Sequence, residues 1–498
     1  MSFLFGRSTN GSSTQKYKSS QFGPRTAGIH NKSHMSTQSH SGASGLLNRT
    51  TGFNSHDTSS SLTEEDDFEI ITMEDALPDV ETTDQEVPFG RKFGKKYFGF
   101  GEKVRNLNHG SFGAIPNAVL DARVRHMKDI QLFPDPFFKT GIFNQIAPIR
   151  KQVAELVDAD PDNLVFVTNA TTAVNTILRS YPFKKGDTFI ICNTIYGSCR
   201  NTIQFLQDRV GVKVVELTFT YPMNHAEILD LFTSAIDSYE NVRMAFFDTV
   251  SSMPAATIPW EELCHICRDR GVLSMVDGAH AIGLIPLSLR TARPDFFTSN
   301  LHKWLFTPNS VALLYVDRSQ HHYVHSLPVS AVYLDDNTTL SGDKEQSRLA
   351  DTFLYTGTID YSAILTIPDS IKFRNEVCGG EERIRQYCTD LATRGGALVA
   401  KEFGTEILSG KEDNLITSMV TVALPYNPAD SPSLQGEING KYIEYIIREW
   451  NTFVPISYYK GQWWSRWSAQ VYVDIDDFKY GIRAVLNTLE YLKSLGYK

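Results

Sequence analysis

Two short apolar runs in the segment 273–306 are each followed by a residue that could do chemistry. Asp277 ends the run 272–276, and Lys303 follows the run 295–298 after a polar cluster. Because parallel strands present functional residues beyond their carboxyl ends, we expect both side chains in one crevice. This pair suits pyridoxal 5'-phosphate: the lysine forms a Schiff base, and the carboxylate keeps the pyridine nitrogen protonated. A lysine whose pKa is lowered by burial can also act as a base.

Two other polar clusters follow predicted strands. The strand 164–167 leads into hydroxyl and small residues, 168–173, that open a helix, a geometry that binds phosphate through backbone N–H groups. A simple Thr/Asn helix cap without a ligand is the alternative. The strand 188–192 places Tyr196 at the same sheet edge, where a phenol could stack on a cofactor ring and deliver a proton.

The order of these elements predicts an α/β fold. Further apolar strands at 244–247 and 310–316 alternate with helices, which indicates a mostly parallel sheet covered on both faces. Beyond Glu381 we expect a smaller α+β domain with strands at 418–424 and 471–473. Arg466 in that domain could clamp a substrate carboxylate. An arginine stacked on surface tryptophans is the alternative.

Composition excludes several classes of protein. A net charge of −9 over 498 residues gives no sign of nucleic-acid binding. No apolar run reaches the length needed to span a membrane. Six cysteines do not form a disulfide framework in so long a chain, and a reducing compartment such as the cytoplasm, with or without the nucleus, is expected. Cys264 and Cys267 form a single CxxC, so buried helix cysteines are favoured over a metal site.

The first 87 residues are rich in Ser, Thr, Asn, Gly and His and are predicted to be a disordered tail. No acidic residue precedes Asp57, which leaves mitochondrial targeting as a second interpretation. Phe68 and Ile71 follow four carboxylates and resemble the short motif that adds a strand to autophagy ubiquitin-like proteins. The alternative is an incidental apolar spot in an acidic linker.

With these motifs in hand, the chain from about Pro88 onward resembles class-V, fold-type I pyridoxal-phosphate enzymes. Within them it is similar to the isopenicillin N epimerase-like branch, and most similar to the fungal hercynylcysteine sulfoxide lyases of ergothioneine biosynthesis. The motifs that carry the resemblance are RNLNHGSFG, VTNATTAVNTILR, NTIYGSC, DTVSSMP, VDGAHAIG, SNLHKWLFTP, GGEERI, NTFVP and RWSAQVYV.

The resemblance implies a role for each matching residue in a homodimer. Lys303 would be the Schiff-base lysine and Asp277 the partner of the pyridine nitrogen. His280, where those lyases commonly carry Gln, would donate to the ring oxygen. The remaining implied roles are ring stacking and acid catalysis by Tyr196, phosphate binding by Ala170, Thr171, His302 and the second subunit's Thr358, carboxylate binding by Arg466, and a substrate entrance lined by Asn108 and His109.

The resemblance also implies an organisation and a reaction. A tail (1–87), an N-terminal arm (88–135), a large cofactor-binding domain (136–360) and a small C-terminal domain (361–498) are expected. The implied reaction is a carbon–sulfur β-elimination that converts hercynylcysteine sulfoxide to ergothioneine, through a sulfenic acid, with pyruvate and ammonia. An epimerase of the isopenicillin N type, or a lyase for another cysteine conjugate, is the alternative.

Overall fold

The computed structural model describes residues 87–330, 332–334, 338, 340–408, 415–428 and 431–497. The predicted tail, with Phe68 and Ile71, lies outside the described residues. No described helix combines the length and the apolar character needed to cross a bilayer. The described part of the protein begins at residue 87.

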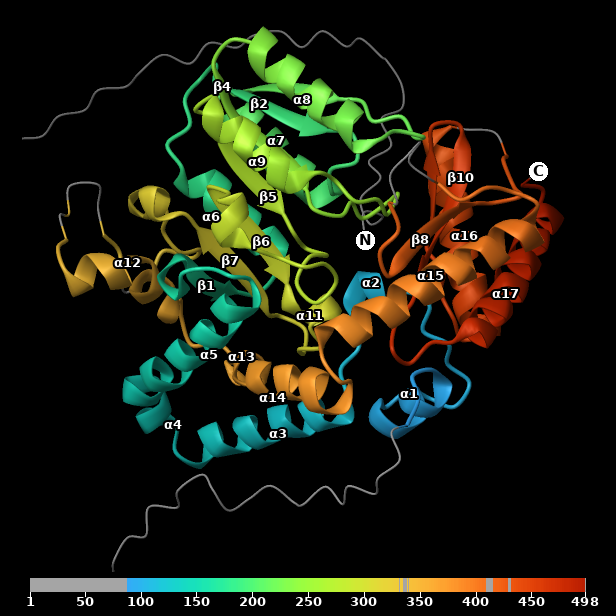
Figure 1. The fold of residues 1–498 in the computed structure, drawn as a ribbon, viewed down its shortest axis with the longest axis horizontal. Helices are drawn as coiled ribbons and strands as arrows, with labels where there is room; N and C mark the ends of the chain where they lie inside the picture. The colour runs from blue at the N-terminus through green and yellow to red at the C-terminus, as the bar shows by residue number, and fades with distance from the viewer. Residues whose placement is uncertain are drawn as a thin grey trace, which may run out of the picture. The chain divides into compact units, whose positions relative to one another are not determined.

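A seven-stranded sheet forms the centre of the larger domain (Figure 1). Its strand order is β1-β7-β6-β5-β4-β2-β3, and only β7 runs antiparallel to its two neighbours. The predicted mostly parallel sheet is therefore confirmed. The strands are β1 (Leu164–Val167), β2 (Thr188–Cys192), β3 (Lys213–Leu217), β4 (Val242–Asp248), β5 (Leu273–Asp277), β6 (Phe296–Asn300) and β7 (Ala312–Val316).

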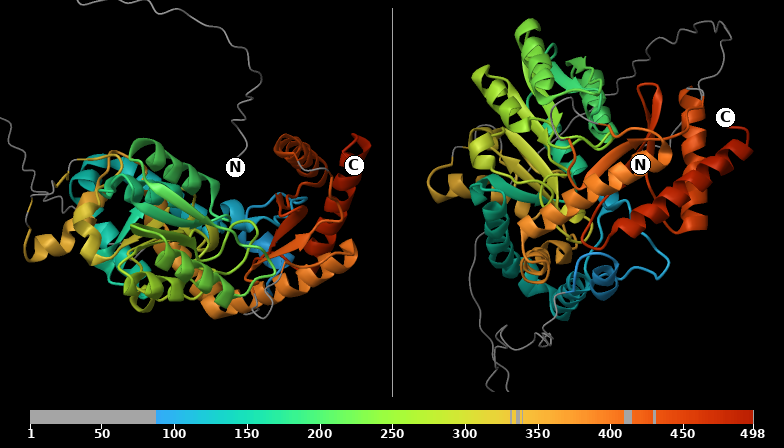
Figure 2. Two further views of the ribbon diagram at one scale, coloured as in Figure 1. Left: turned by 90° about the horizontal axis from the view of Figure 1, so that it is seen from above. Right: turned by 45° about the vertical axis from the view of Figure 1, so that its right-hand side comes forward.

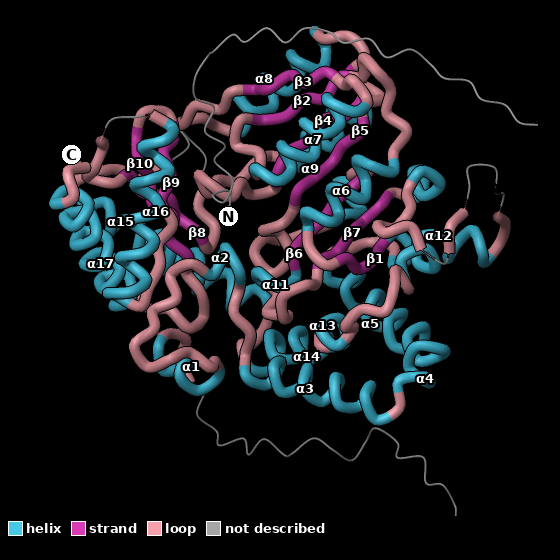
Figure 3. Tube along the Cα trace, turned by 180° about the vertical axis from the view of Figure 1, so that it is seen from behind, coloured by secondary structure: helices cyan, strands magenta, loops and turns pink. Residues whose placement is uncertain are grey.

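Helices cover both faces of this sheet, which explains why its central strands are buried along their whole length. Every residue of β2, β5, β6 and β7 is buried, as expected of strands that face helices on both sides. The helices α6 and α7 pack against each other, as do α8 and α9, and Figures 1 and 3 show the two pairs beside the strands. Their bounds are α6 (Ala170–Ser180), α7 (Gly197–Arg209), α8 (His225–Ser238) and α9 (Trp260–Asp269).

The C-terminal part builds a second core around a three-stranded antiparallel sheet, in the order β8-β10-β9. Its elements are β8 (Met419–Ala423), β9 (Ile456–Tyr459), β10 (Gln462–Ser468), α15 (Glu381–Phe403), α16 (Pro432–Trp450) and α17 (Ile475–Ser494). The predicted strand at 471–473 is wrong, because Val471 and Tyr472 form a turn and the strand is β10. The tryptophans that flank Arg466 are thus strand residues with alternating sides.

The start of the N-terminal arm joins the C-terminal core rather than the large one. In the arm, α1 (Arg91–Tyr97) and α2 (His109–Phe112) precede α3 (Asn117–Leu132). Phe93 and Phe98 belong to the core cluster of the C-terminal domain, and Figure 2 shows the blue arm beside the red helices.

The remaining helices lie around the large domain, and the main ones are α5 (Ile142–Leu156), α10 (Leu289–Ala292), α11 (Leu301–Trp304), α12 (Asp343–Leu354), α13 (Ser362–Leu365) and α14 (Ile367–Lys372). The large core runs on to Ile367, and the C-terminal core begins at Phe373. The change from one core to the other therefore falls inside this helical segment, a few residues after position 360.

One buried arginine ties the two cores together next to Lys303. The guanidinium of Arg374 donates to the backbone carbonyls of Trp304 (2.6 Å) and Gly283 (3.1 Å). It also pairs with Glu381 at the start of α15. Because α15 belongs to the C-terminal core, this contact fixes the loop after Lys303 against the second domain.

Replacing Arg374 with alanine should destabilise the protein strongly. The change leaves two buried carbonyls without donors and Glu381 without its cation, which should lower the unfolding free energy by about 3 kcal/mol. A denaturant titration followed by circular dichroism measures the fall in the unfolding midpoint.

The matched control is Arg394→Ala, which breaks an exposed pair with Asp390 within α15. Exposed pairs of this kind contribute about 0.5 kcal/mol. Equal midpoints for the two variants would contradict the clamp at Arg374.

Candidate active site

Lys303 lies in the short helix α11, directly after β6. Asn300, the last residue of β6, accepts a hydrogen bond from the Ala170 N–H (2.9 Å), so the ends of β6 and the start of α6 are joined. Burial, together with the nearby charge of Arg466, lowers the pKa of Lys303 from 10.5 to about 8. A substantial fraction of this amine is therefore unprotonated near neutral pH, as a nucleophile or base requires.

His280 contacts the amine of Lys303 directly. Its Nε2 lies 3.0 Å from Lys303 Nζ, and its Nδ1 accepts a hydrogen bond from the indole N–H of Trp304 (3.1 Å). Burial and the charge of Lys303 hold the pKa of His280 well below its usual range, so the ring is neutral. The structure therefore places His280 beside Lys303, and its predicted contact with a cofactor ring oxygen stays a prediction.

Two carboxylates lie below the lysine at the ends of adjacent strands. Asp277 of β5 and Asp248 of β4 are paired across the sheet, and both are buried. Asp277 accepts hydrogen bonds from the Ala279 N–H (2.9 Å) and from the thiol of Cys199 (3.4 Å). No described residue donates to Oδ2 of Asp248.

Burial raises the pKa of both carboxyls, and that of Asp248 more strongly because it has fewer donors and lies next to Asp277. Two carboxylates in one dry site cannot both stay charged, so the proton rests on Asp248 and the charge on Asp277. Sequence reasoning missed Asp248 and Cys199 as site residues. Their positions in the sequence could have indicated them, because Asp248 ends the strand next to β5 and Cys199 lies in the first helical turn after Tyr196.

Two glycines allow other loops to approach the lysine segment. A Cβ at Gly113, whose φ is +72°, would lie 1.8 Å from the carbonyl oxygen of His302. A Cβ at Gly283, whose φ is +79°, would lie 2.6 Å from the carbonyl oxygen of Trp304. The loop after Asn108 therefore needs glycine at position 113, because it approaches this backbone closely.

The predicted phosphate residues meet at the start of α6. Asn169 caps the helix by accepting from the Thr172 N–H (2.8 Å), and the hydroxyls of Thr168 and Thr172 are 2.9 Å apart. His302 lies two residues after Asn300, the residue that accepts a hydrogen bond from the Ala170 N–H. The Nδ1 of His302 lies 3.0 Å from the Val311 carbonyl. Of the first three N–H groups of α6, those of Ala170 and Thr172 are already bonded to Asn300 and Asn169, which leaves that of Thr171 for an anion.

Arg466 on β10 is a buried cation, 3% exposed, without an anionic partner. Its guanidinium donates to the Ser252 carbonyl (2.8 Å), Asn108 Oδ1 (2.8 Å) and Ser111 Oγ (2.7 Å). Its Nε has no partner, and no ion pair joins it to a carboxylate within the described ranges. Burial lowers its pKa to about 10. These uncharged partners fix the direction of the guanidinium but do not neutralise its charge, which is available to a ligand.

Three other predicted residues differ in how far they are exposed. Tyr196, 39% exposed, caps α7 at the end of β2. Thr358 is exposed and bonds only Tyr355 in its own loop (2.7 Å). His109 is fully buried, with Nδ1 2.8 Å from the Tyr472 hydroxyl. His109 therefore does not line an open entrance, and burial lowers its pKa to about 3.

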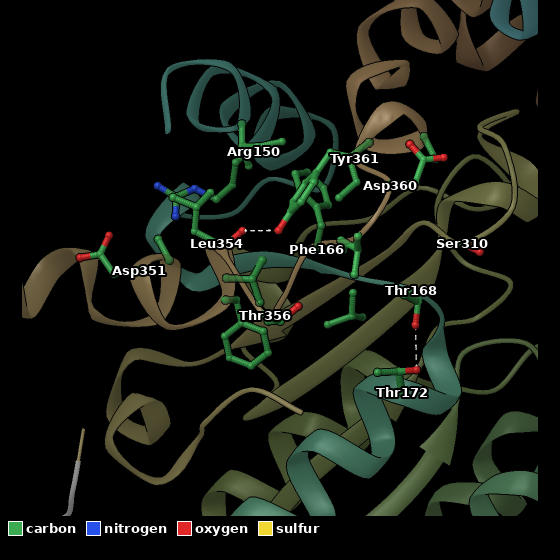
Figure 4. Close-up of a pocket in the computed structure, with 18 of the residues that line it drawn as sticks. Arg150, Phe166, Thr168, Thr172, Ser310, Asp351, Leu354, Thr356, Asp360 and Tyr361 are labelled. Atoms are coloured by element: carbon green, nitrogen blue, oxygen red, sulfur yellow. Dashed lines mark hydrogen bonds between the residues drawn. The ribbon is translucent and has the colours of Figure 1, made fainter. Parts of the chain in front are cut away.

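A cavity of about 560 Å³ lies beside the phosphate end but does not contain the lysine (Figure 4). Thr168 and Thr172 line it on one side, away from Arg150 and Asp351. Lys303, Asp277, His280 and Arg466 are not among its lining residues.

The residues present fit pyridoxal phosphate. The unpaired Arg466, the proton-bearing Asp248 next to Asp277 and the lysine held by His280 have no evident structural use within the chain. A helix end for phosphate, a carboxylate for the pyridine nitrogen and an amine for the aldehyde are the groups the cofactor needs.

Comparisons with known proteins agree with this chemistry. Residues 138–430 match the family model of class-V aminotransferases. The chain belongs to the class-V aminotransferase family. Membership confirms both the predicted cofactor, pyridoxal 5'-phosphate, and the predicted family.

The relatives include enzymes of sulfur amino acids. Over 78% of this chain and 94% of the relative, it is 30% identical to hercynylcysteine sulfoxide lyase of Schizosaccharomyces pombe. It is 31% identical to an L-cysteine desulfhydrase-like protein of Epichloe uncinata, over 79% and 94% of the two chains. A cystine C–S lyase structure, at 16% identity, superposes with a TM-score of 0.63 over 77% and 97% of the chains, which confirms the fold.

The low pKa of Lys303 predicts how the cofactor-free protein should react. Labelling of Lys303 by formaldehyde and borohydride needs the neutral amine, so its rate should rise to half its plateau near pH 8. Mass spectrometry of the Lys303 peptide across a pH series measures this midpoint. The same peptide in denaturant-unfolded protein is the control, with an expected midpoint near the usual 10.5. Identical midpoints in both states would contradict the site geometry.

Proposed function

We propose that this protein is a pyridoxal-phosphate-dependent carbon–sulfur β-lyase that cleaves hercynylcysteine sulfoxide to a sulfenic acid, pyruvate and ammonia. The observation that carries the proposal is the buried Arg466, which has no ion-pair partner among the described residues, in the same site as Lys303, whose pKa is lowered to about 8. An α-amino acid supplies the carboxylate that this arginine lacks. The identity to a hercynylcysteine sulfoxide lyase supports the choice of substrate.

Arg466 holds the substrate by its α-carboxylate. Guanidinium and carboxylate form paired, charge-assisted hydrogen bonds, which orient the amino acid as well as bind it. Asn108, Ser111 and Ser252 already occupy part of the guanidinium and fix its direction. Asn108 therefore positions the arginine that binds the substrate, whereas the resemblance implied that it lines the substrate entrance.

Lys303 removes the α-proton. When bound, the cofactor withdraws electrons from the α-carbon and so makes this proton acidic. Asp277 keeps its negative charge because Asp248 carries the shared proton, and that charge holds a proton on the pyridine nitrogen. His280, whose Nε2 lies next to Lys303 Nζ, would donate a hydrogen bond to the ring oxygen of the bound cofactor.

Tyr196 delivers the proton to the leaving group. The Cβ–S bond breaks with its electron pair on sulfur, and the sulfenate takes up a proton as it leaves. The remaining three-carbon enamine adds water and separates into pyruvate and ammonia. The partial exposure of Tyr196 leaves one side of the site open to a bulky sulfur substituent.

The cysteines argue against a persulfide-forming desulfurase. Such an enzyme needs a cysteine thiolate on an accessible loop. All six cysteines are buried, and burial raises the pKa of each thiol. The sulfur of the substrate therefore leaves without transfer to the protein.

We also infer a homodimer, in which Thr358 of one copy would bind the phosphate held by the other. Thr356, Ile359 and Asp360, in the loop of Thr358, line the cavity beside Thr168. Large apolar side chains are exposed nearby at Leu120, Val124, Met127, Leu132, Phe133, Phe143, Val329, Tyr333 and Ile359. A second copy would cover this apolar surface and bring its own loop to the phosphate end of α6.

Hercynylcysteine sulfoxide should give pyruvate in a 1:1 ratio to substrate consumed. The test supplies the cofactor-loaded protein with this sulfoxide, L-cysteine or isopenicillin N, and couples pyruvate to lactate dehydrogenase. Lys303→Ala should form none. Pyruvate from L-cysteine alone would replace the proposed substrate, and inversion of isopenicillin N without pyruvate would replace the lyase by an epimerase.

The same assay examines the carboxylate clamp. Arg466→Ala should lower kcat/KM by about a hundredfold, since it removes a buried charge partner. The exposed Arg448→Ala is the control. An unchanged kcat/KM in Arg466→Ala would remove the observation on which the substrate assignment rests.

Thr358→Ala should weaken cofactor binding by about tenfold while the protein stays dimeric, since one hydrogen bond to a charged group is lost. Light scattering should give twice the 56.0 kDa chain mass. Leu132→Arg should produce monomers and weaken cofactor binding at least as much. Leu495→Arg, at an exposed apolar site in the C-terminal domain, is the control. Monomeric wild-type protein would refute the dimer.

A further inference from the structure

The indole of Trp304 follows Lys303 in the chain and points its N–H back at His280. Its side chain is 1% exposed. The ring packs against His109 at a centroid distance of 4.9 Å, and a Cβ on Gly110 would lie 3.3 Å from the indole. The indole is thus held on two sides, and its hydrogen bond to His280 Nδ1 (3.1 Å) has a fixed direction.

Counting protons along this contact fixes the tautomer of His280. An indole N–H can only donate a hydrogen bond. Nδ1 of His280 must therefore accept, and it carries no proton. A neutral imidazole has one N–H, so that hydrogen lies on Nε2. An imidazolium would place a hydrogen on each ring nitrogen and would set two N–H groups against each other.

The same count then fixes the state of Lys303. Nε2 of His280 carries its hydrogen toward Lys303 Nζ, 3.0 Å away. An ammonium group has three hydrogens and no lone pair, so it cannot accept. The contact is a hydrogen bond only when Lys303 is a neutral amine.

We propose that Trp304 is a positioning residue that locks His280 in the Nε2–H tautomer and thereby favours the free amine of Lys303 over the ammonium before the cofactor binds. In the loaded protein, the same Nε2–H is left to donate toward the ring oxygen. The inference does not depend on which amino acid is the substrate.

Other charged and titratable groups around Lys303 and His280 favour or disfavour the protonated forms of these two side chains. A positive charge on β10 disfavours the ammonium, whereas acidic groups on β4, β5 and α7 favour it. The buried imidazole on α2 also disfavours a charged His280. These facing groups are Arg466, Asp248, Asp277, Cys199 and His109. The acidic groups favour the ammonium form of Lys303, and this is the effect that the Nε2–H tautomer of His280 opposes.

Nitrogen NMR of cofactor-free protein labelled at histidine reads the tautomer without any mutation of Trp304. The signal of His280 is assigned by its loss in His280→Gln. The expected state is a protonated Nε2 and an unprotonated Nδ1. A protonated Nδ1 in the wild-type protein would overturn the proposal, whatever substrate the enzyme turns out to use.

The labelling midpoint of Lys303 gives the second test. In Trp304→Phe, His280 can turn its lone pair toward the lysine and accept from the ammonium. The midpoint should rise by about one pH unit, a tenfold loss of reactive amine at neutral pH. In a His280→Ala background, the same change should have no effect on the midpoint.

The matched control is Trp463→Phe. Trp463 is equally buried, and its indole N–H has no partner within the part of the chain that the structure describes. Its loss removes a comparable volume and should leave the midpoint unchanged. A midpoint that is the same in Trp304→Phe and wild type would refute the positioning role, as would equal shifts in both tryptophan variants.

Discussion

The site depends on keeping four ionisable groups in one poorly hydrated space. Separating several charges from water costs several kcal/mol each unless they neutralise or pair. The amine of Lys303 and the carboxyl of Asp248 respond by favouring their neutral forms. Arg466 cannot respond in this way because a guanidinium keeps its proton in proteins. Since the proposed function reserves Asp277 for the pyridine nitrogen, the substrate carboxylate would be the direct ion-pair partner of Arg466.

The fold brings these groups together from parts of the chain that are distant in sequence. The parallel sheet supplies Asp248, Asp277 and Lys303 at one edge, since β4, β5 and β6 are neighbours. Arg466 comes from a different sheet and a different core. Contacts such as that of Arg374 with the Trp304 carbonyl hold the two cores in a fixed relation at this edge.

Much of the cofactor site could be predicted because its strands are buried on both faces. The bounds of β1 and β2 match the predicted ranges, and the ends of β5 and β6 correctly placed Asp277 and Lys303. Strands at the sheet edge and in the C-terminal domain were harder to predict from the sequence. The strand β3, exposed in part at the sheet edge, has no continuous apolar run, and β10 mixes Arg466 with tryptophans.

Contacts between side chains could not be predicted in the same way. The spacing of Trp304 and His280 says nothing about an indole N–H turned back onto the imidazole. The burial of His109 behind Trp304 likewise depends on how α2 packs against α11. A motif gives the residue types near a reacting atom, whereas the proton positions depend on the donors that each of them meets.

This proton pattern also predicts the effect of a glutamine at position 280. A glutamine amide also offers one acceptor and one donor at a fixed separation. With the indole N–H of Trp304 on the acceptor side, the amide oxygen would turn to the tryptophan and the NH₂ group to the lysine. Both residues would then present a donor to Lys303 and to the ring oxygen. The exchange therefore leaves the first proton transfer unchanged, and the choice between elimination and inversion falls to groups farther from the ring, near Tyr196 and the sulfur substituent.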